Sequence, residues 1–215
     1  KKGMVAMKGS YHGKSFGALS LTFNPKYRKA FSPLVEKVSF ASFGDMDSLR
    51  SAIDEDTALI ILEPIQGESG IIVAPDGFLQ EVRKLCNEKG ILLIFDEIQA
   101  GLGRTGRLWA GEHWNTTPDI LCLAKGIAGG VPMGATLVRP DILAAISKGE
   151  HSSTFGGNPI SCAAGIAALT SITEDGLIEN SKKMGEIFRE GLEKLKEKHT
   201  MIRDIRGKGL MIGIE

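Results

Sequence analysis

Short apolar runs alternate along this chain with longer amphipathic stretches, and this alternation restricts the possible folds more than any other feature. We expect strands at 4–7, 38–43, 58–62, 91–95, 120–123 and 135–138. Several of these runs are apolar on both faces, which is typical of parallel strands covered by helices on both sides. Helices are expected between them at 45–53 and 77–89. The pattern predicts an α/β fold with a mostly parallel sheet between helices.

The last third of the chain has a different pattern. Asn158 followed by Pro159 predicts a helix start, because asparagine caps helices and proline fits the first helical position. A second helix is expected over 177–199 and a strand over 209–214. We therefore predict a large domain at 1–175 and the beginning of a smaller α+β domain at 176–215. The second helix is expected to carry one apolar stripe: Met184, Ile187, Phe188, Leu192 and Leu195.

Composition excludes several classes of protein. The 215 residues include 26 basic and 26 acidic side chains, whereas proteins that bind nucleic acid through phosphates usually have a basic excess. No apolar run approaches the roughly 20 residues of a membrane-spanning helix. The cysteines and histidines show no metal-ligand spacing. The chain has neither a secretion signal nor a Met at position 1. We expect an internal fragment of a cytoplasmic protein, with no metal, nucleic-acid or membrane partner.

Three of the apolar runs end at a charged residue. Glu63 follows the run at 58–62, Asp96 follows the run at 91–95, and Lys125 follows Ala124 after the run at 120–123. Ligands of open parallel sheets bind beyond the carboxyl ends of the strands. Two carboxylates and one amine at this edge predict a ligand site.

Pyridoxal phosphate chemistry needs such a set of residues. Its aldehyde forms a Schiff base with a lysine, and a carboxylate keeps its ring nitrogen protonated. Hydroxyl groups and backbone N–H groups bind its phosphate, and an aromatic side chain packs on its ring. Lys125, Asp96, Ser153, Thr154 and Tyr11 supply these chemical groups. Their spacing permits this cofactor but does not single it out.

One motif favours a different cofactor. Gly101, Gly103 and Gly106 match the dinucleotide-binding pattern G-x-G-x-x-G, which should follow a strand directly and open a helix. Here residues 96–100 separate the motif from the strand, and Arg104 lies where tight packing is needed. A nicotinamide-dependent dehydrogenase is therefore disfavoured, although it stays an alternative.

Seven short motifs, taken in order, resemble class III aminotransferases, and they span essentially the whole chain. They are Tyr-His-Gly at 11–13, Glu-Pro-Ile-Gln-Gly-Glu-Ser-Gly at 63–70, Phe-Asp-Glu-Ile-Gln-Ala-Gly at 95–101, Arg-Thr-Gly at 104–106, Leu-Ala-Lys-Gly at 123–126, Ser-Thr-Phe-Gly-Gly-Asn-Pro at 153–159 and Arg-Gly-Lys-Gly-Leu at 206–210. The resemblance implies the large domain of a fold type I pyridoxal-phosphate transferase that works as a homodimer.

The resemblance also implies roles for single residues. Lys125 would form the Schiff base and carry the proton between substrate and cofactor. Asp96 would pair with the ring nitrogen, with Glu63 supporting the site from the neighbouring strand end. Gln99 would hydrogen-bond the ring hydroxyl, and Tyr11 would stack on one ring face.

Further cofactor contacts are implied for four other residues. Ile98 would press on the second face of the ring, and His12 belongs to the cofactor-binding set. Ser153 and Thr154 lie in the phosphate-binding motif, where Thr154 would reach the cofactor of the opposite subunit. A monomer is therefore expected to be poorly active.

The substrate-binding set consists of Lys14, Glu68 and Arg206. Glu68 and Arg206 resemble a switch pair, in which the glutamate neutralises the arginine until a substrate carboxylate replaces it. Lys14 followed by Ser15 stands where acetylornithine and ornithine enzymes usually carry Arg-Thr. This departure is more similar to putrescine aminotransferases, whose donor has no carboxylate.

The implied activity is transfer of a terminal amino group to 2-oxoglutarate by a ping-pong mechanism, giving an aldehyde and glutamate. The donor is a diamine or an ω-amino acid, and the sequence does not choose between putrescine, ornithine, acetylornithine and 4-aminobutyrate. An aminomutase or racemase of the same fold is the main alternative. A catalytically silent fragment is a further one.

Overall fold

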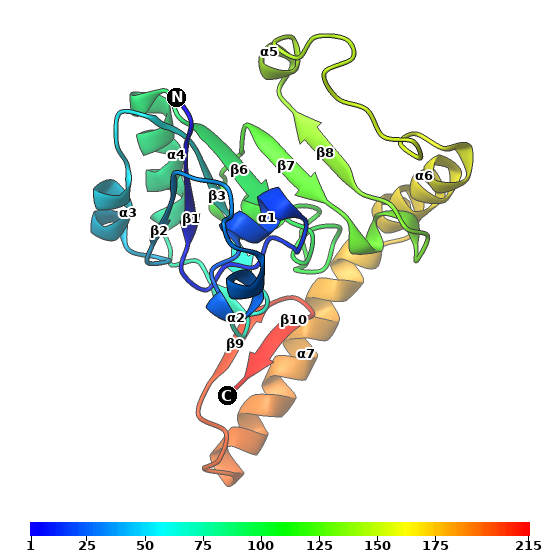
Figure 1. Cartoon of the computed structure of the whole chain (residues 1–215). Coiled ribbons are helices and arrows are strands. Elements are labelled where there is room, and N and C mark those ends of the chain that lie inside the picture. The colour runs from blue at the N-terminus through cyan, green and yellow to red at the C-terminus, as the bar shows by residue number, and fades with distance from the viewer.

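The computed structural model describes residues 1–215 and contains a central six-stranded sheet in the order β2-β1-β3-β6-β7-β8 (Figure 1). Neighbouring strands are parallel except for β8, which runs antiparallel to β7. The six expected strands are confirmed, with ends that shift by at most two residues. They are β1 (Gly3–Met7), β2 (Val38–Ala41), β3 (Thr57–Leu62), β6 (Leu92–Asp96), β7 (Ile120–Leu123) and β8 (Ala135–Val138).

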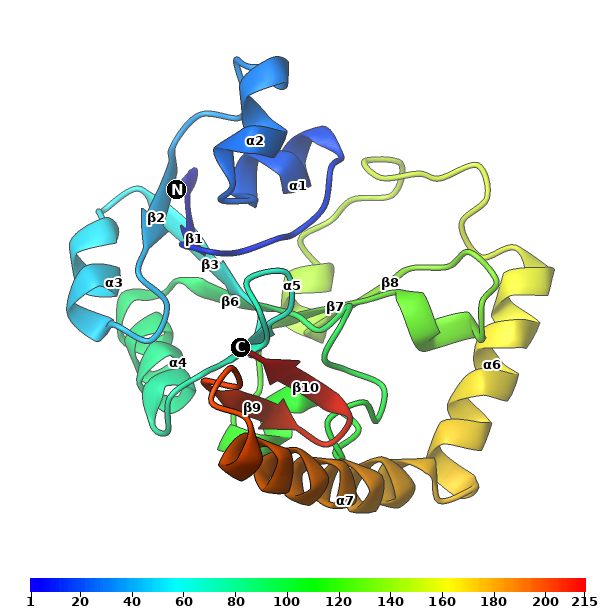
Figure 2. The same ribbon diagram turned by 90° about the horizontal axis from the view of Figure 1, so that it is seen from below.

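Helices cover both faces of this sheet, as the apolar character of its strands predicted. Figure 2 shows α1 and α2 on one side, and α4 and α7 on the other. The helices are α1 (Phe16–Leu21), α2 (Pro25–Arg28), α3 (Met46–Ala52), α4 (Phe78–Lys89), α5 (Pro140–Leu143), α6 (Pro159–Glu174) and α7 (Leu177–Lys198), with the 3-10 helices η1 (Lys29–Phe31), η2 (Ala110–Trp114) and η3 (Lys125–Ala128).

Side-chain caps fix the starts of two predicted helices. Asp45 accepts hydrogen bonds from the backbone N–H groups of Asp47 and Ser48, each at 3.0 Å, and so begins α3. Asn158 accepts one from Ser161 N–H at 2.9 Å at the start of α6. Such caps satisfy backbone donors that the helix itself leaves free.

One hydrophobic core of 24 buried residues joins the sheet to α4. Phe78, Val82 and Leu85 of α4 are buried in it, as their helical spacing predicted. The central strands β3 and β6 each contribute two large apolar side chains to this core. These are Ile60, Leu62, Leu93 and Phe95.

The C-terminal part corrects one expectation. The strand expected at 209–214 is a hairpin of β9 (Ile205–Lys208) and β10 (Met211–Ile214), which pair antiparallel. Gly209 has φ +53°, a left-handed conformation that lets the chain turn back at this point. A second small hairpin, β4 (Ile65–Gln66) with β5 (Ile72–Val73), follows β3.

The expected stripe on α7 is mostly exposed. Leu192 is buried, whereas Ile187, Phe188 and Leu195 are about half exposed. The expected division at residue 175 falls between the end of α6 and the start of α7, yet Met211 belongs to the main core. The separate small domain stays a prediction. No helix has both the length and the apolar character needed to cross a membrane.

Candidate active site

The sheet brings the three charged strand ends to one edge. β6 lies between β3 and β7 and is parallel to both. Glu63 directly follows β3, Asp96 is the last residue of β6, and Lys125 begins η3 just after β7. The carboxyl ends of neighbouring parallel strands are where open α/β sheets bind ligands. The three residues therefore meet at one edge of the sheet, as the apolar runs predicted, and ligand binding at this edge stays a prediction.

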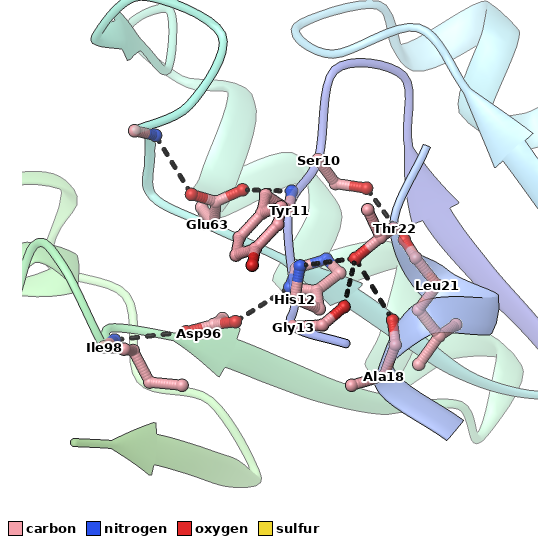
Figure 3. Close-up of polar contacts among 11 residues, drawn as sticks. Ser10, Tyr11, His12, Gly13, Ala18, Leu21, Thr22, Glu63, Asp96 and Ile98 are labelled. Carbon is pink, nitrogen blue, oxygen red and sulfur yellow. Dashed lines mark hydrogen bonds and ion pairs between the residues drawn. The ribbon is translucent and has the colours of Figure 1, made fainter. Parts of the chain in front are cut away.

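Asp96 lies at the centre of a buried hydrogen-bond network (Figure 3). Its side chain is 7% exposed; Oδ2 lies 2.8 Å from Nδ1 of His12, and Oδ1 accepts the backbone N–H of Ile98 at 3.1 Å. An ionised carboxylate only accepts hydrogen bonds, so the His12 ring donates from Nδ1. About two of the four acceptor positions of the carboxylate stay free for a ligand N–H group.

Glu63 fixes the segment that carries Tyr11 and His12. Its Oε1 accepts the backbone N–H of Tyr11 and its Oε2 that of Gly67, both at 3.0 Å (Figure 3). Burial raises the pKa of Glu63, and the two N–H donors oppose that rise. The backbone N–H of His12 also donates to Thr22 Oγ1 at 2.9 Å. The imidazole that holds Asp96 is therefore itself held in place.

Lys125, Ile98 and Gln99 line one cleft of about 630 Å³. Lys125 is exposed to this cleft and forms no ion pair within the chain. Its backbone is left-handed, with φ 49°, and two other residues that line the cleft, Ile71 and Leu102, have φ 59°. Non-glycine residues in this conformation are uncommon and tend to cluster at functional sites.

Gln99 also contacts the loop after β3. Its Nε2 lies 3.5 Å from Glu68 Oε1, which places the glutamate beside the cleft. A Cβ atom at Gly67 would lie 2.2 Å from Gln99 Oε1, so glycine at this position leaves room for the observed position of the Gln99 amide. The structure therefore brings Gln99 and Glu68 together with Ile98 and Lys125.

Lys14 contacts Tyr27, which in turn packs against Tyr11. Its ammonium group lies 5.0 Å from the centre of the Tyr27 ring, and that ring meets Tyr11 edge-on at 5.7 Å. Tyr11, Tyr27 and Glu68 line a small cavity of about 210 Å³. Two residues expected to contact substrate therefore lie near the predicted stacking tyrosine.

The expected Glu68–Arg206 pair is not formed. Arg206 Nη1 pairs with Asp204 Oδ2 at 2.7 Å and with Glu215 Oε2 at 2.8 Å, while its Nε donates to the Gly70 carbonyl at 2.8 Å. Nearby acidic partners thus neutralise Arg206, which ties β9 to the loop after Glu68. These contacts hold Arg206 in place in the structure, and its role toward a substrate carboxylate stays a prediction.

Ser153 and Thr154 lie apart from the other predicted residues. Both are exposed in the segment between α5 and α6 and line neither cavity described above (Figure 1). Their contact with a cofactor phosphate in a second subunit stays a prediction.

Glu97 is a buried residue that the sequence analysis did not identify. Its carboxylate accepts the backbone N–H groups of Ala110 at 2.6 Å and Gly111 at 2.8 Å, and so anchors η2 to the end of β6. Burial raises the pKa of Glu97 from 4.5 to about 7, against the effect of these two donors. The only sequence signal was a second acidic residue directly after Asp96.

This shift makes stability depend on pH. Because the folded-state pKa of Glu97 lies above its unfolded value, its contribution is fully present below about pH 4.5 and is lost as pH rises through about 7. A shift of this size corresponds to about 3 kcal/mol of unfolding free energy. Glu97→Gln is expected to lose this part of the pH dependence. Urea unfolding at a series of pH values measures it, with exposed Glu81→Gln as the control; equal slopes in wild type and Glu97→Gln would contradict the assignment.

The site has the chemical groups that a pyridine-aldehyde cofactor requires. An unpaired lysine lines a cleft, and a buried aspartate with free acceptor positions stands at the adjoining strand end, held by His12. Lys125 would hold the aldehyde, and Asp96 would hold the proton of the ring nitrogen. Fold and site together define a class: the cofactor-binding domain of a pyridoxal-phosphate enzyme.

Comparison with known proteins identifies the family. The whole chain, residues 1–215, matches the family model "Aminotransferase class-III". The chain therefore belongs to the class III aminotransferases, a family of transferases whose cofactor is pyridoxal phosphate.

Individual relatives agree with this family. The chain is 46% identical to the acetylornithine aminotransferase of Methanopyrus kandleri, covering 98% of this chain and 54% of that protein. It is also 46% identical to ornithine aminotransferase 1 of Staphylococcus saprophyticus, covering 99% of this chain and 54% of the relative. The chain thus spans about half the length of these relatives.

Solved structures show the same fold. The ornithine aminotransferase of Toxoplasma gondii has a TM-score of 0.96 at 37% identity, and the match covers 99% of this chain and 51% of that one. A transaminase from the marine bacterium Virgibacillus has a TM-score of 0.91 at 30% identity, covering 97% of this chain and 51% of that one. The expected fold type I architecture is therefore confirmed.

Proposed function

We propose that the protein containing this chain is a transaminase that moves a terminal amino group from a diamine or ω-amino acid to 2-oxoglutarate. The products would be an aldehyde and glutamate, formed by a ping-pong mechanism. The observation that carries this proposal is the unpaired Lys125 in a cleft with Gln99, next to the strand end where His12 holds Asp96.

Each residue of the site has a defined task in this proposal. Pyridoxal phosphate, when bound, supplies an electron-withdrawing ring that stabilises negative charge on the reacting carbon. Asp96 keeps the ring nitrogen protonated, and Lys125 carries the proton to and from the substrate carbon once its amine is free. Tyr11 and Ile98 enclose the ring, and Gln99 donates to the ring hydroxyl.

We infer that the enzyme works as a homodimer. Ser153 and Thr154 lie in an exposed segment that is followed by three strongly exposed apolar residues, Phe155, Ile160 and Ile166, at 80%, 77% and 67% exposure. Large apolar side chains this exposed are more common at a subunit interface than on a free surface. A second copy packed on these residues would bring the hydroxyl of Thr154 toward its neighbour's cofactor phosphate. A cytoplasmic location is part of the same proposal.

The relatives and Lys14 favour different amine donors. Those relatives are named acetylornithine and ornithine aminotransferases, which favours an ornithine-like donor. Lys14 favours putrescine instead, because a lysine lacks the planar fork with which arginine binds a carboxylate. A panel of putrescine, ornithine, acetylornithine and 4-aminobutyrate with the full-length enzyme decides between them.

Lys14→Arg is expected to shift this donor preference. A bidentate contact with the donor carboxylate should raise kcat/KM for ornithine relative to putrescine by about tenfold. Lys26→Arg, on the exposed side of α2, serves as the matched control. An unchanged ratio of the two kcat/KM values would show that Lys14 does not contact the donor.

An aminomutase or racemase of the same fold is the alternative function. Glutamate accumulates from 2-oxoglutarate only in a transamination. Incubation of the enzyme with a donor and 2-oxoglutarate, followed by glutamate analysis, therefore separates the two reactions. An isomerised donor without glutamate would overturn the proposal.

A further inference from the structure

A second cavity lies outside the candidate active site and has a different chemical character. Its volume is about 250 Å³, and none of its ten lining residues is hydrophobic. It is formed where the turn at 105–107, helix α7 and the end of β9 meet. It shares no lining residue with the cleft that holds Lys125. Figure 2 shows α7 running alongside the β9–β10 hairpin at this part of the molecule.

The lining of this cavity is strongly basic. It contains four cationic side chains, Arg107, Lys182, Arg189 and Lys208, against one carboxylate, Glu186. Glu186 forms no ion pair, and the nearest carboxylate to Lys182 is that of Glu179 at 4.0 Å. The positive charge is therefore largely uncompensated by the protein.

Two of the cations are fixed by their neighbours. The Lys208 ammonium group lies 5.3 Å from the centre of the buried Trp114 ring, and Arg189 donates a hydrogen bond to the Gly207 carbonyl. Such contacts reduce the entropy that these side chains would lose on binding a ligand. The cavity thus has a basic wall that is ordered before any ligand arrives.

The positive charges of the cavity also affect the pKa of His113. Its Nε2 lies 3.1 Å from the Thr105 carbonyl oxygen. Burial lowers the pKa of His113, and the positive charges of Lys208 and Arg107 lower it further. Positive charges from two separate segments therefore act on one side of the cavity.

Glycines allow the three segments to meet this closely. A Cβ atom at Gly185 would lie 2.1 Å from the Gly209 carbonyl oxygen, and one at Gly209 would lie 2.4 Å from the Thr105 carbonyl carbon. A Cβ atom at Gly106 would lie 2.8 Å from Cβ of Lys182. The cationic side chains consequently converge on a small volume instead of spreading over the surface.

We propose that this cavity binds a phosphoryl oxyanion, either free phosphate or the phosphate group of a small metabolite. Arginine and lysine are the side chains that bind phosphate best, the first through a planar fork and the second as a point charge. The cavity is smaller than the roughly 300–1,000 Å³ of sites for larger ligands, and it has no apolar wall for a nucleobase or an acyl chain.

A bound oxyanion would connect parts of the chain that are distant in sequence. Arg107 lies just beyond the segment that carries Asp96 and Gln99, whereas Lys182 and Arg189 belong to α7 and Lys208 to β9. The anion would add ionic contacts between these elements and stabilise their packing by mass action. This site goes beyond the proposed transaminase activity and does not depend on it.

Calorimetric titration of the full-length holoenzyme tests the proposal. The enzyme is saturated with pyridoxal phosphate beforehand, so that the cofactor's own phosphate site is filled, and ionic strength is held constant with chloride. Inorganic phosphate and glycerol phosphate are titrated separately. Binding of either one supports the proposal, and the tighter of the two identifies the source of the phosphate. Absence of binding by both would overturn it.

Charge-removing variants locate the bound anion. The double variant Arg107→Gln, Lys182→Gln is expected to bind phosphate at least about tenfold more weakly, because it loses two charge-assisted contacts with the anion. Lys183→Gln removes one positive charge from the position of α7 next to Lys182, outside the cavity, and should bind phosphate as wild type does. Equal affinity in the double variant and this control would overturn the proposal.

A second measurement does not depend on these variants. In the NMR spectrum of the wild-type holoenzyme, the ring signals of His113 should move as phosphate is added, in step with the calorimetric saturation. Cofactor absorbance should stay constant during this titration, which separates the anion site from the active site. Ring signals of His113 that stay unmoved at saturation would contradict the assignment of the anion to this cavity.

Discussion

Lys125→Ala is expected to lower the rate of transamination by about 10⁴-fold or more. The variant loses both the amine that holds the cofactor and the base that moves the substrate proton, and a positioned acid–base group alone contributes about 10²–10⁴-fold. No other lysine lines the cleft that holds Ile98 and Gln99. A neighbouring amine is therefore not available to take over either task. Steady-state rates with the best donor of the panel measure the effect.

Exposed Lys183→Ala on α7 is the control for this loss. It removes the same side chain at a position that contacts neither cavity, and it should keep the wild-type rate and cofactor content. Unfolding midpoints of both variants, measured without cofactor, should stay close to that of wild type, because exposed positions contribute little to stability. A Lys125→Ala enzyme with a rate within tenfold of wild type would show that another group does this chemistry.

Asp96→Asn is expected to have the second largest effect, about 10²- to 10⁴-fold on kcat. The amide has nearly the shape of the carboxylate but carries no charge, so it does not hold the ring nitrogen in its protonated form. Removing one partner of a buried ion pair costs about 3–5 kcal/mol. A loss of transition-state stabilisation of this size lowers kcat by about 10²- to 10⁴-fold. The amide must also satisfy the contact with His12, now 2.8 Å from Oδ2.

Asp76→Asn provides the matched control, because Asp76 is an exposed carboxylate that lines neither the cleft of Lys125 nor the cavity of Tyr11. The absorbance of the bound cofactor gives a second readout, since the protonation state of the ring affects it. A changed spectrum together with a lower kcat supports the role of Asp96. Wild-type kcat and spectrum in Asp96→Asn would remove that role.

The sheet could be predicted from sequence because its strands are apolar on both faces. Runs such as 58–62 and 91–95 are typical of strands in a parallel sheet that helices cover on both faces. The observed ends of β3 and β6 differ from the expected ends by at most one residue. The hairpin β9–β10 was harder to predict. Its first strand contains Arg206, Gly207 and Lys208, which carry no alternating apolar pattern, and only Ile205 of this strand is buried.

The site residues at strand ends could be predicted from the sequence. The residues whose partners depend on tertiary contacts could not. Glu63, Asp96 and Lys125 follow apolar runs, so sequence alone placed them at one edge. The partners of Arg206 depend on how β9 packs beside Gly70. Arg206 pairs with Asp204, two positions before it, and with Glu215, nine positions after it, and not with Glu68. The role of Glu97 could not be predicted without the position of η2, because its two backbone N–H donors lie 13 and 14 residues away in sequence.

The most direct test of the account is to reduce the full-length holoenzyme with borohydride and map the product by peptide mass spectrometry. Reduction fixes the cofactor permanently to the amine that holds it. The account predicts the added pyridoxyl mass on the peptide that contains Lys125, and on no other lysine. The added mass on a different lysine, or a fully reduced enzyme without any modified peptide, would contradict it.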